Sequence, residues 1–159
     1  MTQAQSGSTP AAAPTGAGIR SGSIVVRRTI PATVDELFDA FLDADSLAQW
    51  MHPGITARST VSVDARVGGR FEVVMHHEGG PLRHYGEYRV IERNRKLVFT
   101  WFSDATHHME TLVTVEFLAR TASTEVVLTH ERMPDHDAAL KHNHGWTLAL
   151  ELLEAVARH

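Results

Sequence analysis

Histidine is the residue type in this sequence that most suggests chemistry, because its side chain gains or loses a proton near neutral pH and can act as a general acid or base. The chain has 11 histidines. Two doublets, His76-His77 and His107-His108, lie at the ends of expected strands, where successive side chains point to opposite faces. One member of each doublet can therefore face inward and form part of a polar rim. The alternative is a scattered surface excess of histidine.

Acid-base catalysis needs a His, Glu, Asp or Tyr that lies in a pocket and has a shifted pKa. The residues that we would test for this role are His108, His130, Tyr85 and Glu110. The sequence contains no G-x-S-x-G, H-E-x-x-H, G-x-x-x-x-G-K or G-x-G-x-x-G motif. Nucleophilic, phosphoryl-transfer and hydride-transfer enzymes are therefore disfavoured, and we expect no cofactor.

We also expect no metal site. The chain has no cysteine, and a zinc site needs three or four converging ligands. Neither histidine doublet supplies that geometry. His142 and His144 would lie about 200° apart around a helix, so they cannot share an ion.

The three tryptophans, Trp50, Trp101 and Trp146, lie on three different expected elements. A ligand could stack on them, and the alternative is that they fill the core. Trp50, next to Met51 and His52, is the better candidate for the entrance of a cavity. The residues that we expect to contact a ligand are Trp50, His52, Phe71, Val73, Met75, Tyr85, Trp101, Met109, His130, Trp146 and Leu150.

Arg28 falls at an inward position of its expected strand, in phase with Val26 and Ile30. A buried charge needs a partner. We favour a structural ion pair, and the alternative is that Arg28 anchors a carboxylate or phenolate of a ligand. The strand carboxylates that could pair with it are Glu72, Glu87, Glu110 and Glu116.

Length and composition exclude several classes of protein. A chain of 159 residues with 43% hydrophobic residues can build one core. Its net charge of -4 has the wrong sign for a protein that binds nucleic acid by neutralising phosphates. No apolar run is long enough to span a membrane and no signal pattern opens the chain, so we expect a cytoplasmic protein.

The hydrophobic pattern predicts one α+β domain over residues 23–159, preceded by a disordered tail at 1–22 that is rich in small and polar residues. A capping box at Thr33 and Glu36 opens one short helix, and Asp45-Ser46 can cap a second. A long helix that is opened by Gly145-Trp146 ends the chain. We expect seven strands, at 24–30, 57–63, 71–75, 83–92, 96–102, 108–118 and 124–130.

This order of elements resembles the SRPBCC superfamily (START and birch-pollen-allergen proteins) of helix-grip folds. It is most similar to the branch homologous to the activator of the heat-shock-protein-90 ATPase. The resemblance spans residues 24–156. Its motifs are Ile30-Pro31-Ala32, Leu47 to Trp50, Val67-Gly68-Gly69-Arg70-Phe71, Gly86-Glu87-Tyr88, Leu97-Val98-Phe99-Thr100-Trp101 and Gly145-Trp146.

The resemblance implies a curved antiparallel sheet wrapped around a long C-terminal helix, with a cavity between them. Superfamily members bind lipids, sterols, polyketides and hormones, and some are cyclases, aromatases or hydrolases. We expect no co-chaperone role, because the additional domain through which the eukaryotic co-chaperone engages its client is not found here.

Three hypotheses for the function follow. The first is that the cavity binds a hydrophobic small molecule, with an aromatic compound as one option. The second is a cofactor-free acid-base enzyme of the cyclase, dehydratase or hydrolase type that uses the same cavity, and the third is a chaperone-type interaction module. The apolar stripe of the last helix could serve a homodimer as well as a core.

Overall fold

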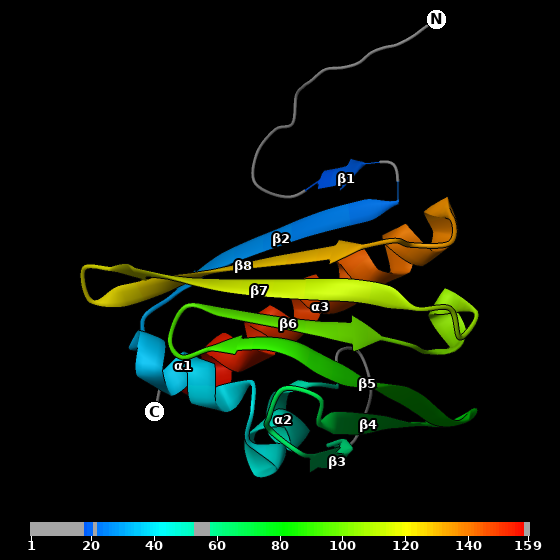
Figure 1. Ribbon diagram of the computed structural model, residues 1–159, viewed down its shortest axis with the longest axis horizontal. Coiled ribbons are helices and arrows are strands. Elements are labelled where there is room, and N and C mark those ends of the chain that lie inside the picture. The colour runs from blue at the N-terminus through cyan, green and yellow to red at the C-terminus, as the bar shows by residue number, and fades with distance from the viewer. Residues whose placement is uncertain (1–17, 21, 53–57, 158–159) are drawn as a thin grey trace, which may run out of the picture.

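The computed structural model describes residues 18–20, 22–52 and 58–157. These residues form one antiparallel sheet of eight strands in the order β1-β2-β8-β7-β6-β5-β4-β3 (Figure 1). The strands are β1 (Gly18–Arg20), β2 (Ser23–Ile30), β3 (Thr60–Val63), β4 (Arg70–His77), β5 (Gly80–Glu92), β6 (Lys96–Trp101), β7 (Thr111–Arg120) and β8 (Ser123–Glu131). The helices are α1 (Val34–Ala40), α2 (Ala44–Trp50), the short 3₁₀ helix η2 (Asp104–Thr106) and α3 (His136–Ala157).

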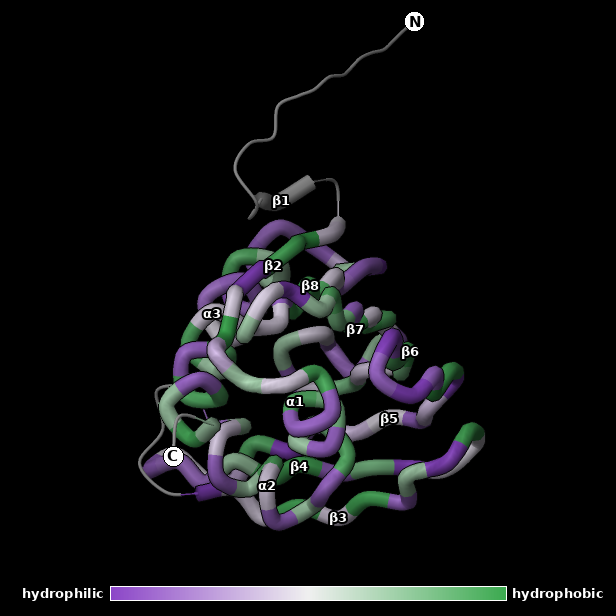
Figure 2. Tube along the Cα trace, turned by 90° about the vertical axis from the view of Figure 1, so that its left-hand side faces the viewer, coloured by the Kyte–Doolittle hydropathy of each residue, from purple (hydrophilic) through white to green (hydrophobic). Residues whose placement is uncertain are grey.

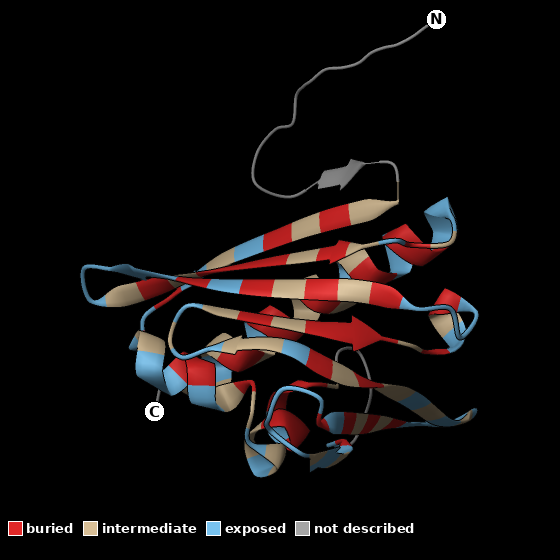
Figure 3. Cartoon of the chain, viewed as in Figure 1, coloured by how far each residue is buried: buried red, intermediate tan, exposed pale blue. Residues whose placement is uncertain are grey.

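The long helix α3 covers one face of the sheet, which curves around it, and α1 and α2 lie beside it (Figure 2). Buried and accessible residues alternate along the strands, as the two-residue period of a sheet with one covered face requires (Figure 3). The α+β helix-grip fold expected from the sequence is therefore confirmed.

Side-chain caps fix where the two short helices begin. The Thr33 hydroxyl accepts a hydrogen bond from the backbone N–H of Glu36 at 3.1 Å, as expected. The second helix is capped by Asp43, whose carboxylate accepts from the N–H of Ser46 at 2.9 Å, and not by Asp45-Ser46. Its first turn therefore begins one residue before Asp45.

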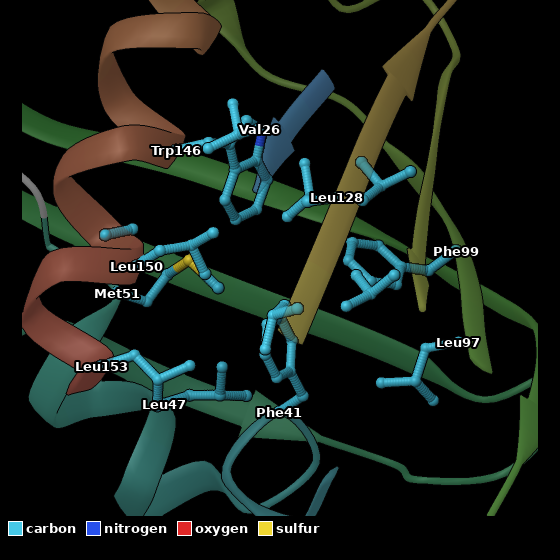
Figure 4. Packing of buried hydrophobic residues seen from close by; sticks show 14 of the residues in the cluster. Val26, Phe41, Leu47, Met51, Leu97, Phe99, Leu128, Trp146, Leu150 and Leu153 are labelled. Atoms are coloured by element: carbon cyan, nitrogen blue, oxygen red, sulfur yellow. The ribbon is translucent and has the colours of Figure 1, made fainter. Parts of the chain in front are cut away.

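The core lies between the sheet and the helices. Leu150 and Leu153 of α3 face Leu47 and Met51 of the α2 region, and strand residues such as Leu128 complete the cluster (Figure 4). Aromatic rings from α1, α2 and β7 pack edge to face at centroid separations of 4.8 to 5.5 Å; they are Phe38, Phe41, Trp50 and Phe117.

Several element boundaries differ from those expected: β3 is shorter at its start, and β4 and β5 are longer than predicted. Strand β1 lies in the segment expected to be a disordered tail and pairs with β2, with Ile19 opposite Ile24. The long helix begins at His136 rather than near Trp146, because the Asp135 carboxylate accepts from the N–H of Ala138 at 2.8 Å and starts it earlier. The segment from His108 to Glu110 precedes β7 instead of belonging to it.

Candidate functional site

A cavity of about 180 Å³ lies between α3 and the strands β4, β5 and β6. Its polar side chains are His84, Lys141 and His142. The other residues around it are almost all apolar; they are Met51, Met75, Leu82, Trp101, Ala105, Gly145, Trp146 and Ala149. Such a chamber, apolar with a few polar groups, is the usual form of a small-molecule site.

The regular spacing of residues along α3 and β5 explains why these side chains point into the cavity. On α3, His142, Trp146 and Ala149 follow one another at helical spacing and share a face. On β5, Leu82 and His84 are two residues apart and point to the same side of the sheet. A Cβ atom at Gly145 would meet nothing within 4 Å, so the helix leaves open space there.

The wall made by Trp101 and Trp146 is held by a chain of hydrogen bonds through His130. The indole N–H of Trp146 donates to Nδ1 of His130 at 3.0 Å, so the proton of the neutral ring must be on Nε2. That N–H donates to the Thr111 hydroxyl at 2.7 Å, and the hydroxyl donates to the Trp101 carbonyl at 2.6 Å. Both ring nitrogens of His130 are therefore used within the protein.

Burial keeps the histidines of this region uncharged. Loss of solvation is the main cause that lowers the pKa of His84 to about 4. The same cause lowers the pKa of His142 and takes that of His130 well below its ordinary value. At neutral pH all three rings are neutral, so the cavity contains no imidazolium cation.

Each of the two cavity histidines has one nitrogen directed at a backbone carbonyl. Nδ1 of His142 lies 2.7 Å from the carbonyl oxygen of Ala138. Nδ1 of His84 lies 3.3 Å from that of Val73. Because a carbonyl only accepts hydrogen bonds, Nδ1 carries the proton in the ring of His142.

A second, smaller void of about 20 Å³ lies next to the cavity, on the side of α1 and α2. Met51 and Trp101 line both spaces. Phe71 and Val73, two of the residues expected to contact a ligand, line this smaller void. Its volume is enough for about one water molecule, so a ligand must occupy the larger space.

The family model for Activator of Hsp90 ATPase homolog 1-like proteins matches residues 31–158. The chain belongs to this family. The resemblance identified from the sequence is thereby confirmed. A comparison with curated proteins gave no match.

Solved structures share the fold of this chain. Protein CV1439 from Chromobacterium violaceum is 22% identical, with a TM-score of 0.75, and the match covers 87% of this chain and 98% of that one. CalU16 from Micromonospora echinospora is 22% identical over 86% of this chain and 76% of that one, with a TM-score of 0.66. PFC0360w, an HSP90 activator from Plasmodium falciparum, is 26% identical over 86% of this chain and 96% of that one, with a TM-score of 0.71.

The ligand-contacting residues expected from the sequence are only partly brought together. Met75, Trp101 and Trp146 line the cavity. Two others are in the core: Leu150 is fully buried, and so is Trp50, whose indole N–H donates to the Ala40 carbonyl at 3.1 Å. Trp50 therefore belongs to the core and not to an entrance.

His52, Tyr85 and Met109 do not line the cavity either. Nε2 of His52 lies 2.8 Å from the carbonyl of Gln49, and Met109 is 54% exposed. Tyr85 follows the inward-pointing His84 on β5 and therefore points to the opposite face of the sheet. There its ring stacks on Phe102, with a centroid separation of 5.1 Å.

The catalytic candidates separate into two groups. The Tyr85 hydroxyl lies 3.1 Å from Nδ1 of His108, whose Nε2 lies 2.7 Å from a carboxylate oxygen of Asp104. Tyr85 and His108 are on the face of the sheet away from the cavity, whereas Asp104 shares a pocket with the cavity residues His84 and Ala105. Glu110 is on the surface, 4.0 Å from the guanidinium of Arg89 and 3.9 Å from that of Arg132, whereas His130 is fully buried.

Arg28 forms a structural ion pair, as favoured, but with a different partner. Its Nε lies 2.7 Å from the carboxylate of Glu154 on α3. None of the four carboxylates expected from the sequence is this partner. The pair joins β2 to the long helix and lies outside the cavity lining.

Several cavity residues were not expected from the sequence. The sequence signal that could have identified His84 as a cavity residue is its two-residue spacing from Leu82. For His142, the signal is its position four residues before Trp146. The other unexpected residues are Met51, Leu82, Ala105, Lys141, Gly145 and Ala149.

Within the described residues, no group of three or more His, Cys, Asp or Glu side chains could hold a metal ion. No helix in the same part of the chain is long and apolar enough to cross a membrane. Cytoplasmic location and a homodimer stay predictions from the sequence.

Proposed function

We propose that this protein binds a small hydrophobic molecule in the cavity between α3 and strands β4 to β6. The observation that carries the proposal is the cavity itself, whose wall combines Met75, Trp101 and Trp146 with two neutral histidines. Removing the apolar surface of a ligand from water would supply most of the affinity. Members of the family generally bind hydrophobic ligands, which supports the proposal.

The volume of the cavity limits the size of the ligand. An engineered protein cavity of about 150 Å³ lined by aliphatic and aromatic side chains binds benzene. The cavity described above is slightly larger, at about 180 Å³. A molecule with one ring and a small substituent fits this volume, whereas a sterol or polyketide would extend out of it.

The properties of the cavity histidines favour binding over acid-base catalysis. A general base works best when its pKa is near the pH at which the enzyme operates. Burial lowers the pKa of His84 to about 4, so at neutral pH it is a weak base. Two of the expected catalytic residues, Tyr85 and His108, are on the other face of the sheet.

A chaperone-type interaction is the second candidate, favoured by the 26% identity to the Plasmodium falciparum HSP90 activator. It would require a contiguous exposed apolar patch. Among the residues that the structure describes, the large apolar side chains that are exposed come from four separate segments: Val67, Met109, Leu118 and Leu140. A stimulated ATPase rate of an HSP90 on addition of this protein would favour the interaction.

The binding proposal can be tested by calorimetric titration with one-ring probes, toluene and 4-methylphenol, in the wild type and in Gly145→Leu. The leucine side chain enters open space at the cavity wall, so we expect affinity to fall about tenfold or more without loss of folding. Ala155→Leu, an exposed position on the same helix, is the matched control and should bind normally. Equal binding by Gly145→Leu and the wild type would contradict the proposal, as would no binding of either probe.

A further inference from the structure

We propose that the ligand is a neutral molecule of the phenol type, with one ring and one hydroxyl group that donates a hydrogen bond to Nε2 of His142. This inference rests on the proposed function and specifies the chemical class of the ligand. It is carried by a polar atom at the cavity wall that lacks a hydrogen-bond partner.

This atom is Nε2 of His142. Nδ1 of the same ring donates to the Ala138 carbonyl at 2.7 Å, so Nε2 of the neutral ring presents a lone pair. The side chain is almost completely buried and lines the cavity. In the part of the chain that the structure describes, Nε2 makes no hydrogen bond.

A second polar atom is the indole nitrogen of Trp101. This N–H is buried, and among the described residues it has no hydrogen-bond partner. Trp101 also lines the cavity. This nitrogen is covered by its neighbours and presents almost no surface to the cavity, so the polar atom that a ligand meets is Nε2 of His142, which needs a donor such as a hydroxyl.

The other polar side chains around the cavity have partners within the protein, which leaves Nε2 of His142 to the ligand. His84 forms backbone hydrogen bonds to Val73 and Leu82. His130 uses both of its nitrogens, with Trp146 and Thr111. Lys141 is 63% exposed at the rim, and its ammonium lies 3.1 Å from the carboxylate of Asp137.

The same arrangement disfavours a charged ligand. A carboxylate inside the cavity would be desolvated next to the neutral rings of His84 and His142. The ammonium of Lys141 lies at the exposed rim and is already paired with Asp137, so it offsets little of that cost. The Nε2 lone pair of His142 would face the carboxylate oxygens directly. A neutral hydroxyl avoids both penalties.

The test compares ring compounds of similar shape by calorimetric titration. 4-Methylphenol carries the hydroxyl, p-xylene replaces it with a methyl group, and 4-methylanisole keeps the oxygen but lacks the donor. Benzoate is the charged probe. The proteins are the wild type, His142→Phe, which keeps a ring but removes the acceptor, and His144→Phe, a matched change at an exposed position of the same helix.

We expect wild-type protein and His144→Phe to prefer 4-methylphenol over 4-methylanisole and benzoate. In His142→Phe, the affinity for 4-methylphenol relative to p-xylene should fall about fivefold, as expected for one net hydrogen bond. The comparison of 4-methylphenol with 4-methylanisole needs only the wild type, so the inference can be tested even if His142→Phe does not fold.

Two results would overturn the inference but leave the proposed function intact. One is tighter binding of benzoate or 4-methylanisole than of 4-methylphenol by the wild type. The other is the same ratio of 4-methylphenol to p-xylene affinity in His142→Phe and the wild type. If none of the probes binds to the wild type, the proposed function fails together with this inference.

Discussion

Trp146 on α3 donates its indole N–H to Nδ1 of His130 on β8, at 3.0 Å, in a region that is almost completely buried. This bond joins the long helix to the sheet and fixes which nitrogen of His130 carries the proton. The proton on Nε2 continues the chain to Thr111 and from there to the Trp101 carbonyl. Both tryptophans of the cavity wall therefore depend on one neutral histidine.

We predict that His130→Phe destabilises the protein by about 1–3 kcal/mol, because the Trp146 N–H would stay buried without an acceptor. Phenylalanine keeps most of the ring volume, so the loss reports mainly on the hydrogen bond. The measurement is the free energy of unfolding in urea. His144→Phe is the control and should change it by no more than about 0.5 kcal/mol. A His130→Phe protein as stable as the wild type would show that the chain contributes little.

We predict that stability falls as the pH decreases from about 6.5 towards 4. The folded-state pKa of His84 is about 4, below its ordinary value of 6.5, and those of His130 and His142 are also lowered. The unfolded chain therefore binds more protons in this range, and stability increases with pH. His84 alone contributes to the free energy of unfolding at neutral pH by an amount on the order of 3 kcal/mol, and this contribution is lost once the pH is below about 4.

Urea unfolding at pH 7, 6, 5 and 4.5 measures this dependence. Titration of the carboxylates whose pKa values are lowered, Glu125 and Asp135 among them, affects stability mainly at the lower end of the range. His84→Leu should weaken the dependence between pH 6 and 5. The explanation fails if the wild type is equally stable at pH 7 and pH 5.

The sequence predicted the sheet and the long helix because both follow from local periodicity. The alternation of Phe71, Val73 and Met75 and the cap at Thr33 depend on residues only a few positions apart, and the structure confirms them. The start of α3 was missed because it depends on one cap at Asp135, and with it the sequence analysis missed that His142 lines the cavity.

The partner of Arg28 shows why the rest could not be predicted. Glu154 is 126 positions away in the chain, and the pair depends on how α3 is placed across β2, which no local pattern specifies. Tyr85 is a different case. Leu82 and Tyr88 of β5 are apolar or aromatic residues at even-numbered positions, and they already predict that the even-numbered residues from 82 to 88 face inward. The sequence therefore contained the signal that Tyr85 faces outward.

We predict that Arg28→Leu leaves the affinity for 4-methylphenol unchanged, because Arg28 pairs with Glu154 and does not line the cavity. The Arg28 side chain is 35% exposed, so loss of the pair should lower the free energy of unfolding by about 0.2–1 kcal/mol. Titration calorimetry and urea unfolding check the two parts separately. A large loss of affinity with unchanged stability would restore the alternative that Arg28 anchors a ligand.

We predict that Tyr85→Phe also leaves the ligand affinity unchanged, within about twofold, while it loosens the loop that contains η2. The Tyr85 hydroxyl meets Nδ1 of His108 on the outer face of the sheet, and His108 has a left-handed backbone with φ of 56° that the surrounding contacts must hold. Without the hydroxyl, backbone amides between η2 and β7 should exchange hydrogen faster, since local opening costs less.

Hydrogen exchange measured by mass spectrometry tests this prediction. Tyr88→Phe, at a buried tyrosine on the inner face of the same strand, is the comparison. Unchanged exchange in Tyr85→Phe would show that the hydroxyl does not hold the loop. An affinity loss of about tenfold would contradict the other part of the prediction and show that the outer face is coupled to the cavity.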